Sequence, residues 1–158
     1  VTGVQTCALP ILSSYLRLDR VLDLVPCTKQ ELLELMLTML LQDPAIKDPV
    51  AVRKAVLERE NKANTAIGHS IAIPHGRCSG VDDFVVAFAR IKDGMDYGSD
   101  DKEKVKIVFM IVASDTQDKE YIRLLSRLML RLRNPDFIEE LIQAADSTAM
   151  YNLLKVTR

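Results

Sequence analysis

The chain has 158 residues, of which 48% are hydrophobic and 27% charged, and its formal net charge is −1. These values are close to the averages for globular proteins, so they exclude a disordered or fibrous chain and predict one domain around one core. The near-zero charge argues against a nucleic-acid-binding domain, and no apolar run approaches the roughly 18 residues of a membrane-spanning helix.

Residues 1–11, VTGVQTCALPI, show neither helical nor strand periodicity. They resemble translated sequencing adapter, and a signal peptide is the weaker alternative because the stretch has no basic start and only a short apolar run. We therefore expect a non-native leader over residues 1–11 and one domain over residues 12–158. The three cysteines are odd in number and scattered, which favours a reducing, cytoplasmic location over a disulfide framework.

The first half of the domain contains one predicted strand and two predicted helices. After a short lead, residues 20–25 alternate well enough for a strand. Thr28 and Glu31 have the spacing of a capping box, and Asp48 precedes Pro49 in the order expected of a cap and a first helical residue. We therefore expect helices to begin at these two places.

The middle of the chain is rich in β-formers. Residues 70–74 form a brief β-prone segment that ends at His75, and residues 84–91 are rich in branched and aromatic side chains. A Gly- and Asp-rich connection over residues 92–104 leads to residues 105–112, which are nearly all apolar. This last segment is predicted to be a central strand that is covered on both faces.

The last third is predicted to be helical, at about residues 118–133, 135–145 and 147–155, with Asn134 and Asp146 as caps of the second and third helices. The apolar side chains of the first of these helices are expected in the core: Leu125, Leu128, Met129 and Leu132. Helices before, between and after the strands predict an α/β fold, a three-layer α/β/α single domain with a mixed β-sheet.

Imidazole chemistry has few places to occur, because the chain has only two histidines, His69 and His75. His75 is the better placed. Pro74 restricts the backbone before it, and Gly76 after it is expected to allow close approach of another molecule. Gly68 is a second permissive point, just before the β-prone segment.

Phosphoryl transfer is one reaction that suits His75. A neutral imidazole nitrogen is a competent nucleophile near pH 7, because the ordinary histidine pKa is about 6.5. The reaction otherwise needs alignment of the reacting atoms and donors around the phosphoryl oxygens. Arg59 and Arg77 are nearby guanidinium groups, and a guanidinium can hold two phosphate oxygens at once.

Simpler interpretations stay open for the same residues. His69 and His75 are each compatible with a surface histidine, and Arg59 with a surface ion pair. Zinc binding by His69, His75 and Cys78 is disfavoured because a fourth ligand is missing, and a nucleophile pair of Cys78 with His75 lacks an orienting third group. No metal or cofactor is expected. The basic stripe on the long helix is typical of a solvated face: Arg123, Arg127 and Arg131.

Residues 58–76, ERENKANTAIGHSIAIPHG, resemble the phosphorylation-site signature of type 2 enzyme IIA proteins of the bacterial sugar phosphotransferase system. In that signature an acidic or amide residue, here Glu60, is followed by an apolar residue and glycine, here Ile67 and Gly68. Its ending is filled without a gap by Ile71, Ala72, Ile73, Pro74, His75 and Gly76. A weaker similarity extends from about Leu18 to Lys155.

The resemblance implies a function and a set of partners. It makes His75 the phosphoacceptor and Arg59 the arginine that supports the phosphohistidine. The donor would be the phosphocarrier HPr, and in a transport protein the acceptor would be a cysteine of an enzyme IIB. In a nitrogen-regulatory type of protein, the phosphorylation state would instead alter binding to regulatory targets. An alternative is an interaction module with the same fold and no phosphorylation.

One position departs from the family pattern. Many members have a second histidine at the start of the helix after the central strand, and the matching position here is Tyr121. A phenol can donate a hydrogen bond to phosphate but cannot supply a second imidazole. We therefore expect His75 to accept a phosphoryl group, with Tyr121, Gly68 and Gly76 as supporting residues; the missing second imidazole bears on onward transfer and not on acceptance.

Overall fold

The computed structural model describes residues 12–155 of the chain; the predicted leader over residues 1–11 lies outside them. In chain order the elements are a 3-10 helix η1 (Leu12–Tyr15), β1 (Leu16–Leu24), α2 (Lys29–Leu40), α3 (Pro49–Lys62), β2 (Ala66–Gly68), β3 (Ile71–Ala72), β4 (His75–Cys78), β5 (Val85–Met95), β6 (Val105–Ser114), α4 (Asp118–Leu132), α5 (Pro135–Gln143) and α6 (Ser147–Lys155). Within this part of the chain, no helix is both long enough and apolar enough to cross a membrane.

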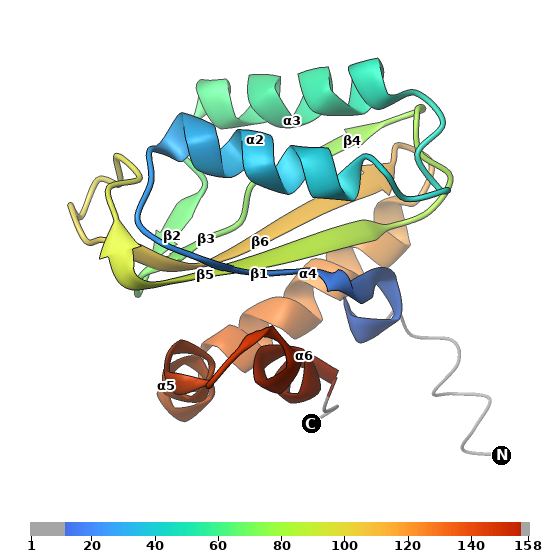
Figure 1. Ribbon diagram of the computed structural model, residues 1–158. Helices are drawn as coiled ribbons and strands as arrows, with labels where there is room; N and C mark the ends of the chain where they lie inside the picture. The colour runs from blue at the N-terminus through green and yellow to red at the C-terminus, as the bar shows by residue number, and fades with distance from the viewer. Residues whose placement is uncertain (1–11, 156–158) are drawn as a thin grey trace, which may run out of the picture.

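The strands form one mixed sheet between two layers of helices (Figure 1). Helices α2 and α3 cover one face, and α4, α5 and α6 cover the other. The strand order is β1-β5-β6-β3-β2, and β4 also pairs with β6. β5 runs antiparallel to β6, whereas β1 is parallel to β5, and β3 and β4 are parallel to β6. The predicted three-layer α/β/α fold with a mixed sheet is confirmed.

The helix starts follow from local sequence chemistry. The Thr28 side chain accepts a hydrogen bond from the Glu31 amide and the Glu31 side chain accepts one from the Thr28 amide, which completes the capping box. Asp48 caps α3 in front of Pro49, and Asn134 caps α5 in the same way. These predicted starts are confirmed, because each depends on a few residues in sequence and little on the rest of the fold.

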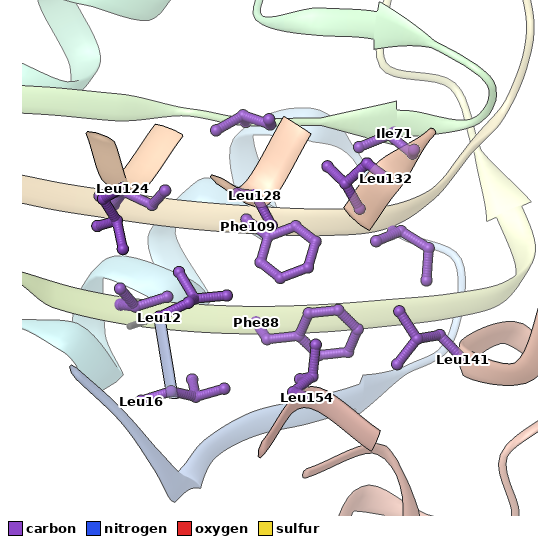
Figure 2. Packing of buried hydrophobic residues seen from close by; sticks show 14 of the residues in the cluster. Leu12, Leu16, Ile71, Phe88, Phe109, Leu124, Leu128, Leu132, Leu141 and Leu154 are labelled. Atoms are coloured by element: carbon purple, nitrogen blue, oxygen red, sulfur yellow. The ribbon is translucent and has the colours of Figure 1, made fainter. Parts of the chain in front are cut away.

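Two apolar clusters stabilise the sheet from its two faces. Alternate side chains of β5 and β6 enter each cluster, as the two-residue period of a strand requires. On the face covered by α4, α5 and α6, Phe88 and Phe109 pack edge to face with ring centroids 5.0 Å apart (Figure 2). β6 is buried along almost its whole length, so the prediction of a central strand covered on both faces is confirmed.

Some strand boundaries were wrong. The strand predicted at residues 20–25 begins at Leu16, where exposed residues obscure the alternation, and β5 continues to Met95 into the predicted connection. The segment 70–74 does not form one strand that ends at His75. Instead β3 ends at Ala72, and His75 begins β4. The hairpin of β2 and β3 was not predicted, because strands of three and two residues are too short to show a period.

Candidate phosphoryl-acceptor site

His75 lies just after an interruption between β3 and β4. Both strands pair with β6, and the register is the same before and after the interruption, with Ile71 opposite Ile107 and His75 opposite Ile111. At the interruption, the Ile73 amide donates to the Thr65 carbonyl at 3.1 Å, and Pro74 has no N–H to offer. Ile73 itself lies outside both ladders, so its carbonyl can accept from a side chain.

That side chain is His75. Its Nδ1 lies 2.8 Å from the Ile73 carbonyl oxygen, which can only accept a hydrogen bond. The contact therefore assigns the ring proton to Nδ1 and leaves Nε2 with a free lone pair, because a neutral imidazole carries one N–H. The backbone of Ile73 thus prepares Nε2 as the nucleophilic nitrogen of the ring.

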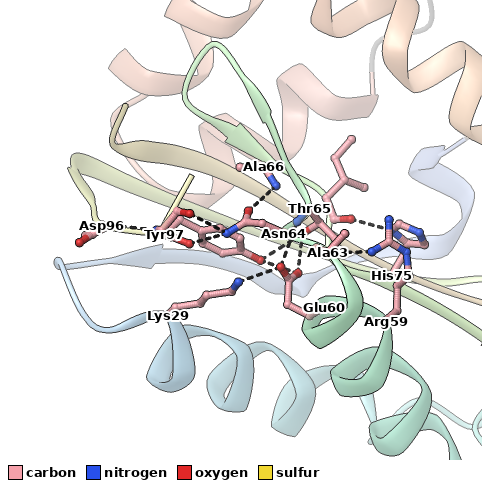
Figure 3. Close-up of polar contacts among 12 residues, drawn as sticks. Lys29, Arg59, Glu60, Ala63, Asn64, Thr65, Ala66, His75, Asp96 and Tyr97 are labelled. Atoms are coloured by element: carbon pink, nitrogen blue, oxygen red, sulfur yellow. Dashed lines mark hydrogen bonds and ion pairs between the residues drawn. The ribbon is translucent and has the colours of Figure 1, made fainter. Parts of the chain in front are cut away.

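Arg59 comes to the same place from the last turn of α3, as Figure 3 shows. One of its terminal nitrogens donates to the Ala63 carbonyl at 2.9 Å. No carboxylate within residues 12–155 lies at ion-pair distance from Arg59, so the alternative of a surface ion pair is not what the structure contains. The guanidinium keeps further donors for an anion.

Arg59 and His75 line a shared cavity of about 200 Å³. The rest of its lining comes from the chain between α3 and β3 and from α4: Asn64, Thr65, Ala66, Ile67, Ile73, Leu125 and Met129. Ile67 and Met129 are 41% and 39% exposed, which gives the cavity an apolar and accessible rim. The prediction that Met129 belongs to the core was wrong, since the side chain faces this rim and not the sheet.

Tyr121 lies in the first turns of α4, beside His75. The two ring centroids are 6.3 Å apart, and Tyr121 is 7% exposed. Its hydroxyl is buried without a hydrogen-bond partner among the described residues. Burial raises the pKa of Tyr121, although Arg77 and Arg59 partly oppose the shift through their charge. The phenol therefore stays protonated near neutral pH and has a hydrogen bond to donate.

Arg77 lies two residues after His75 on the same strand, so both side chains project from one face of β4. Its guanidinium carbon lies 5.0 Å from the centre of the Tyr121 ring, and it forms an ion pair with Asp118 at the start of α4. Tyr121 thus has the cationic group of Arg77 near its ring, in addition to the charge of Arg59.

The two glycines predicted to support the site have different roles. Gly68 has φ +88°, a left-handed conformation that glycine adopts without strain and that turns the chain into the β2–β3 hairpin. Gly76 is buried, and a Cβ there would meet the amide nitrogen of Val56 at 2.9 Å and the carbonyl carbon of Ala55 at 3.1 Å. The expectation that Gly76 admits another molecule was wrong: it admits helix α3.

The competing sites are separated by the fold. His69 is exposed at the hairpin turn, and it does not line the cavity of His75. Cys78 projects from the opposite face of β4 and packs against the cluster under α2 and α3. Within residues 12–155, no three His, Cys, Asp or Glu side chains are grouped as a metal site.

The amino-acid sequence matches a known family. The family model described as "Phosphoenolpyruvate-dependent sugar phosphotransferase system, EIIA 2" matches residues 18–156. The chain belongs to this EIIA 2 family. The resemblance inferred from residues 58–76 is thereby confirmed, and the chain is a phosphotransferase component of the EIIA type.

Curated relatives include both transport and regulatory EIIA proteins. A fructose-specific EIIABC component from Bacillus subtilis is 33% identical over 126 residues, which are 80% of this chain but only 20% of that protein. A fructose-specific EIIA component from Haloferax volcanii is 32% identical over 129 residues, 82% of this chain and 84% of that protein. A nitrogen regulatory protein from Bradyrhizobium diazoefficiens is 32% identical over 104 residues, 66% of this chain and 68% of that protein.

Solved structures of EIIA proteins share the fold. The nitrogen regulatory protein IIA-Ntr from Neisseria meningitidis superimposes with a TM-score of 0.82 at 24% identity, over 91% of this chain and 99% of its own. The mannitol IIA of Escherichia coli, in its complex with phosphorylated enzyme IIB, gives 0.74 at 23% identity over 88% and 97%. At these identities the likeness concerns the fold alone.

Sequence reasoning missed several residues of this EIIA site. The segment of Asn64, Thr65 and Ala66 lines the cavity although its sequence has no clear period, and Leu125 contributes as a partly buried side chain. The Ile73 carbonyl is a backbone atom, so no residue type announces it. The available signal was Pro74, which marks a position where the β-ladder must be interrupted.

Proposed function

We propose that this EIIA chain accepts a phosphoryl group on Nε2 of His75 and either passes it on or keeps it as a regulatory signal. The observation that carries the proposal is the contact of His75 Nδ1 with the Ile73 carbonyl, 2.8 Å long, because it leaves Nε2 unprotonated beside Arg59. A lone pair that is free without prior deprotonation can attack phosphorus directly.

The transfer step is balanced within the site. The Nε2 lone pair forms the new N–P bond while the bond from phosphorus to the donor breaks, and the donor keeps that electron pair. The proton stays on Nδ1, so the phosphorylated ring carries positive charge that the Ile73 carbonyl dipole stabilises. Arg59 supplies guanidinium donors to the phosphoryl oxygens in the same cavity.

The hydroxyl of Tyr121 is the second donor of the proposed site. It is buried, protonated and without a partner in the described chain, which is costly unless a ligand uses it. We assign to it a hydrogen bond to a phosphoryl oxygen, in the position where many family members have a histidine. Gly68 supports the site indirectly, through the hairpin that carries Ile67.

The donor proposed is a phosphorylated HPr-type protein, and the acceptor is a cysteine of an enzyme IIB domain. In a regulatory role, His75 keeps the phosphoryl group, and its presence alters binding to regulatory target proteins. The relatives include fructose-specific components and nitrogen regulatory proteins, so both outcomes fit the family. Cys27 and Cys78 are free thiols, which supports a location in the reducing cytoplasm.

The test is incubation of the chain with phosphoenolpyruvate, enzyme I and HPr, followed by intact mass measurement. The expected gain is one phosphoryl group, about 80 Da. The variant His75→Gln is expected to show no gain, while His69→Gln, which removes the other histidine, is expected to match the wild type. No gain in the wild type would favour an interaction module without phosphorylation, and an undiminished gain in His75→Gln would place the phosphoryl group on another residue; either result overturns the proposal.

A further inference from the structure

A second polar cluster lies directly behind the cavity, centred on Glu60 at the end of α3 (Figure 3). The residue is 5% exposed, and both carboxylate oxygens are used. Oε2 accepts from the Thr65 amide at 3.0 Å and pairs with the Lys29 ammonium at 2.8 Å. Oε1 accepts from the hydroxyls of Thr65 and Tyr97, the latter at 2.9 Å.

The cluster joins three separate parts of the chain. Lys29 is the first residue of α2, Glu60 and Thr65 flank the end of α3, and Tyr97 lies in the connection after β5. Asn64 adds to the same junction, since its side-chain amide donates to the Tyr97 carbonyl at 2.8 Å. A buried carboxylate with four donors around it fixes the backbone that it contacts, because each bond restricts the same small group.

From Thr65 a continuous series of hydrogen bonds runs to the imidazole. Glu60 holds the amide and hydroxyl of Thr65, and the Thr65 carbonyl accepts from the Ile73 amide at 3.1 Å. The carbonyl of the same residue, Ile73, accepts from His75 Nδ1 at 2.8 Å. The N–H and the C=O of Ile73 lie in the peptide units on either side of its Cα, so Thr65 fixes the backbone on one side of the residue whose carbonyl meets His75.

Arg59 depends on the same junction. It precedes Glu60 in α3, and its guanidinium donates to the carbonyl of Ala63, which lies in the short turn between Glu60 and Thr65. Movement of this turn would displace both the guanidinium and the backbone of Ile73. Misplacement of reacting groups by about 1 Å is enough to slow a reaction by about a hundredfold.

We propose that Glu60 is a positioning residue of the phosphoryl site: through Thr65 it holds the Ile73 carbonyl that selects the Nδ1–H tautomer of His75, and through the turn at Ala63 it holds Arg59. The inference rests on the proposed function for its consequence, the rate of transfer, but its structural half concerns the unphosphorylated protein. Glu60 touches neither the imidazole nor the phosphoryl group.

The first measurement is the tautomer of His75, read from the imidazole ¹⁵N chemical shifts of the unphosphorylated protein at a pH where the ring is neutral. A His69→Gln background leaves His75 as the single histidine of the chain. Three variants are compared in it. Glu60→Leu removes every acceptor while keeping a buried side chain, Glu60→Gln keeps an acceptor for the Thr65 amide, and Tyr97→Phe removes a different donor to the same carboxylate.

The parent protein, Glu60→Gln and Tyr97→Phe are expected to keep the Nδ1–H tautomer, whereas Glu60→Leu shows signal from the Nε2–H tautomer. In the phosphorylation assay, Glu60→Leu is expected to be slower than the parent by about tenfold or more, and Tyr97→Phe to stay within about twofold. If Glu60→Gln keeps the tautomer and the transfer rate of the parent protein, the effect of Glu60→Leu is one of positioning. Tyr97→Phe is the control for a general loss of stability, because it also removes a hydrogen bond of the cluster.

The proposal is overturned if His75 of the parent protein is the Nε2–H tautomer, if folded Glu60→Leu keeps the parental tautomer and rate, or if Tyr97→Phe changes both as much as Glu60→Leu does. If Glu60→Leu does not fold, Thr65→Val takes its place: a smaller change of the same sign supports the path, and none contradicts it. A parent protein that shows the Nδ1–H tautomer and accepts no phosphate refutes the proposed function while leaving the structural half of this inference intact.

Discussion

The Glu60 cluster and the His75 cavity are neighbours that differ in how completely their hydrogen-bonding groups are used. Each oxygen of Glu60 has two donors, and the hydroxyl of Tyr97 is partnered. Beside the cavity, next to the His75 ring, the hydroxyl of Tyr121 has no partner among the described residues, and Nε2 of His75 is left without a proton. Saturated groups stabilise a fold, whereas unsatisfied ones carry a cost that a ligand can remove.

The arginines of the chain show the same contrast. Arg90 is 3% exposed and contacts Asp23 together with the carbonyls of Leu141, Ile142 and Ala144, so it joins β5 to the end of α5. Arg59 donates to one carbonyl and faces a cavity. The comparison predicts that Arg90 matters for stability and Arg59 for transfer, and the variants below test that separation.

Replacement of Arg59 by alanine should give the largest effect on transfer. Loss of a preorganised donor to the phosphoryl oxygens is expected to slow phosphorylation of His75 by about 10² to 10³-fold, with little change in the free energy of unfolding. Arg53→Ala is the matched control, because Arg53 lies on the same helix and pairs with Glu34 at the surface. Equal rates for the two variants would remove Arg59 from the mechanism.

Replacement of Arg90 by methionine should reverse this pattern. We expect the free energy of unfolding in urea to fall by about 3 kcal/mol, because a buried partner of Asp23 and of helix-end carbonyls is lost. The phosphorylation rate of the folded protein should not change. Arg17→Met, which breaks an exposed pair with Asp19 at 3.6 Å, should cost less than about 1 kcal/mol. A similar cost for both variants would contradict the distinction.

The fold was predictable where local chemistry decides it and not where distant segments meet. The caps at Thr28, Asp48 and Asn134 need only a few neighbouring residues, and the apolar run of β6 reports its own burial. The strand order and the β2–β3 hairpin depend on pairing between segments. At the hairpin, His69 and Ser70 have φ values of 55° and 67°, and positive φ is uncommon for residues other than glycine, so the sequence does not predict this turn.

The candidate site was predictable to a similar extent. The signature placed His75 and Arg59 near one another, and the structure brings them to one cavity. The role of Gly76 was misread because a missing Cβ shows only that something lies close, and here it is the backbone of α3. The signature included Glu60, but its contacts and the role of the Ile73 carbonyl could not be predicted, since they depend on the interruption between β3 and β4 and on contacts across the fold.

The Glu60 cluster should also be visible in the pH dependence of stability. Burial alone raises the pKa of Glu60, but hydrogen bonds from Lys29, Thr65 and Tyr97 outweigh it, so the pKa lies below its ordinary value. A depressed folded-state pKa means stability that is present above the unfolded value of about 4.3 and is lost as the pH falls through the folded value. Between about pH 5 and about pH 2, the free energy of unfolding in urea should therefore fall more steeply with decreasing pH for the wild type than for Glu60→Gln. Parallel curves would argue against a charged, saturated Glu60.

The smallest expected effect is the most direct test of the contrast between satisfied and unsatisfied hydroxyls. Tyr121→Phe removes a buried hydroxyl with no partner in the described chain, so the free energy of unfolding should rise by about 1 kcal/mol while phosphorylation of His75 slows by about tenfold. Tyr97→Phe removes a hydroxyl that donates to Glu60 at 2.9 Å, so stability should fall by about 1 kcal/mol with the rate nearly unchanged.

The opposite signs of these two changes in the free energy of unfolding matter more than their sizes. A hydroxyl kept for the fold should cost stability when it is removed, and one kept for a ligand should cost only transfer, because without the ligand its burial is a loss. If Tyr121→Phe is destabilised like Tyr97→Phe and transfers phosphate at the wild-type rate, the Tyr121 hydroxyl serves the fold, and the cavity then binds the phosphoryl group through Arg59 alone.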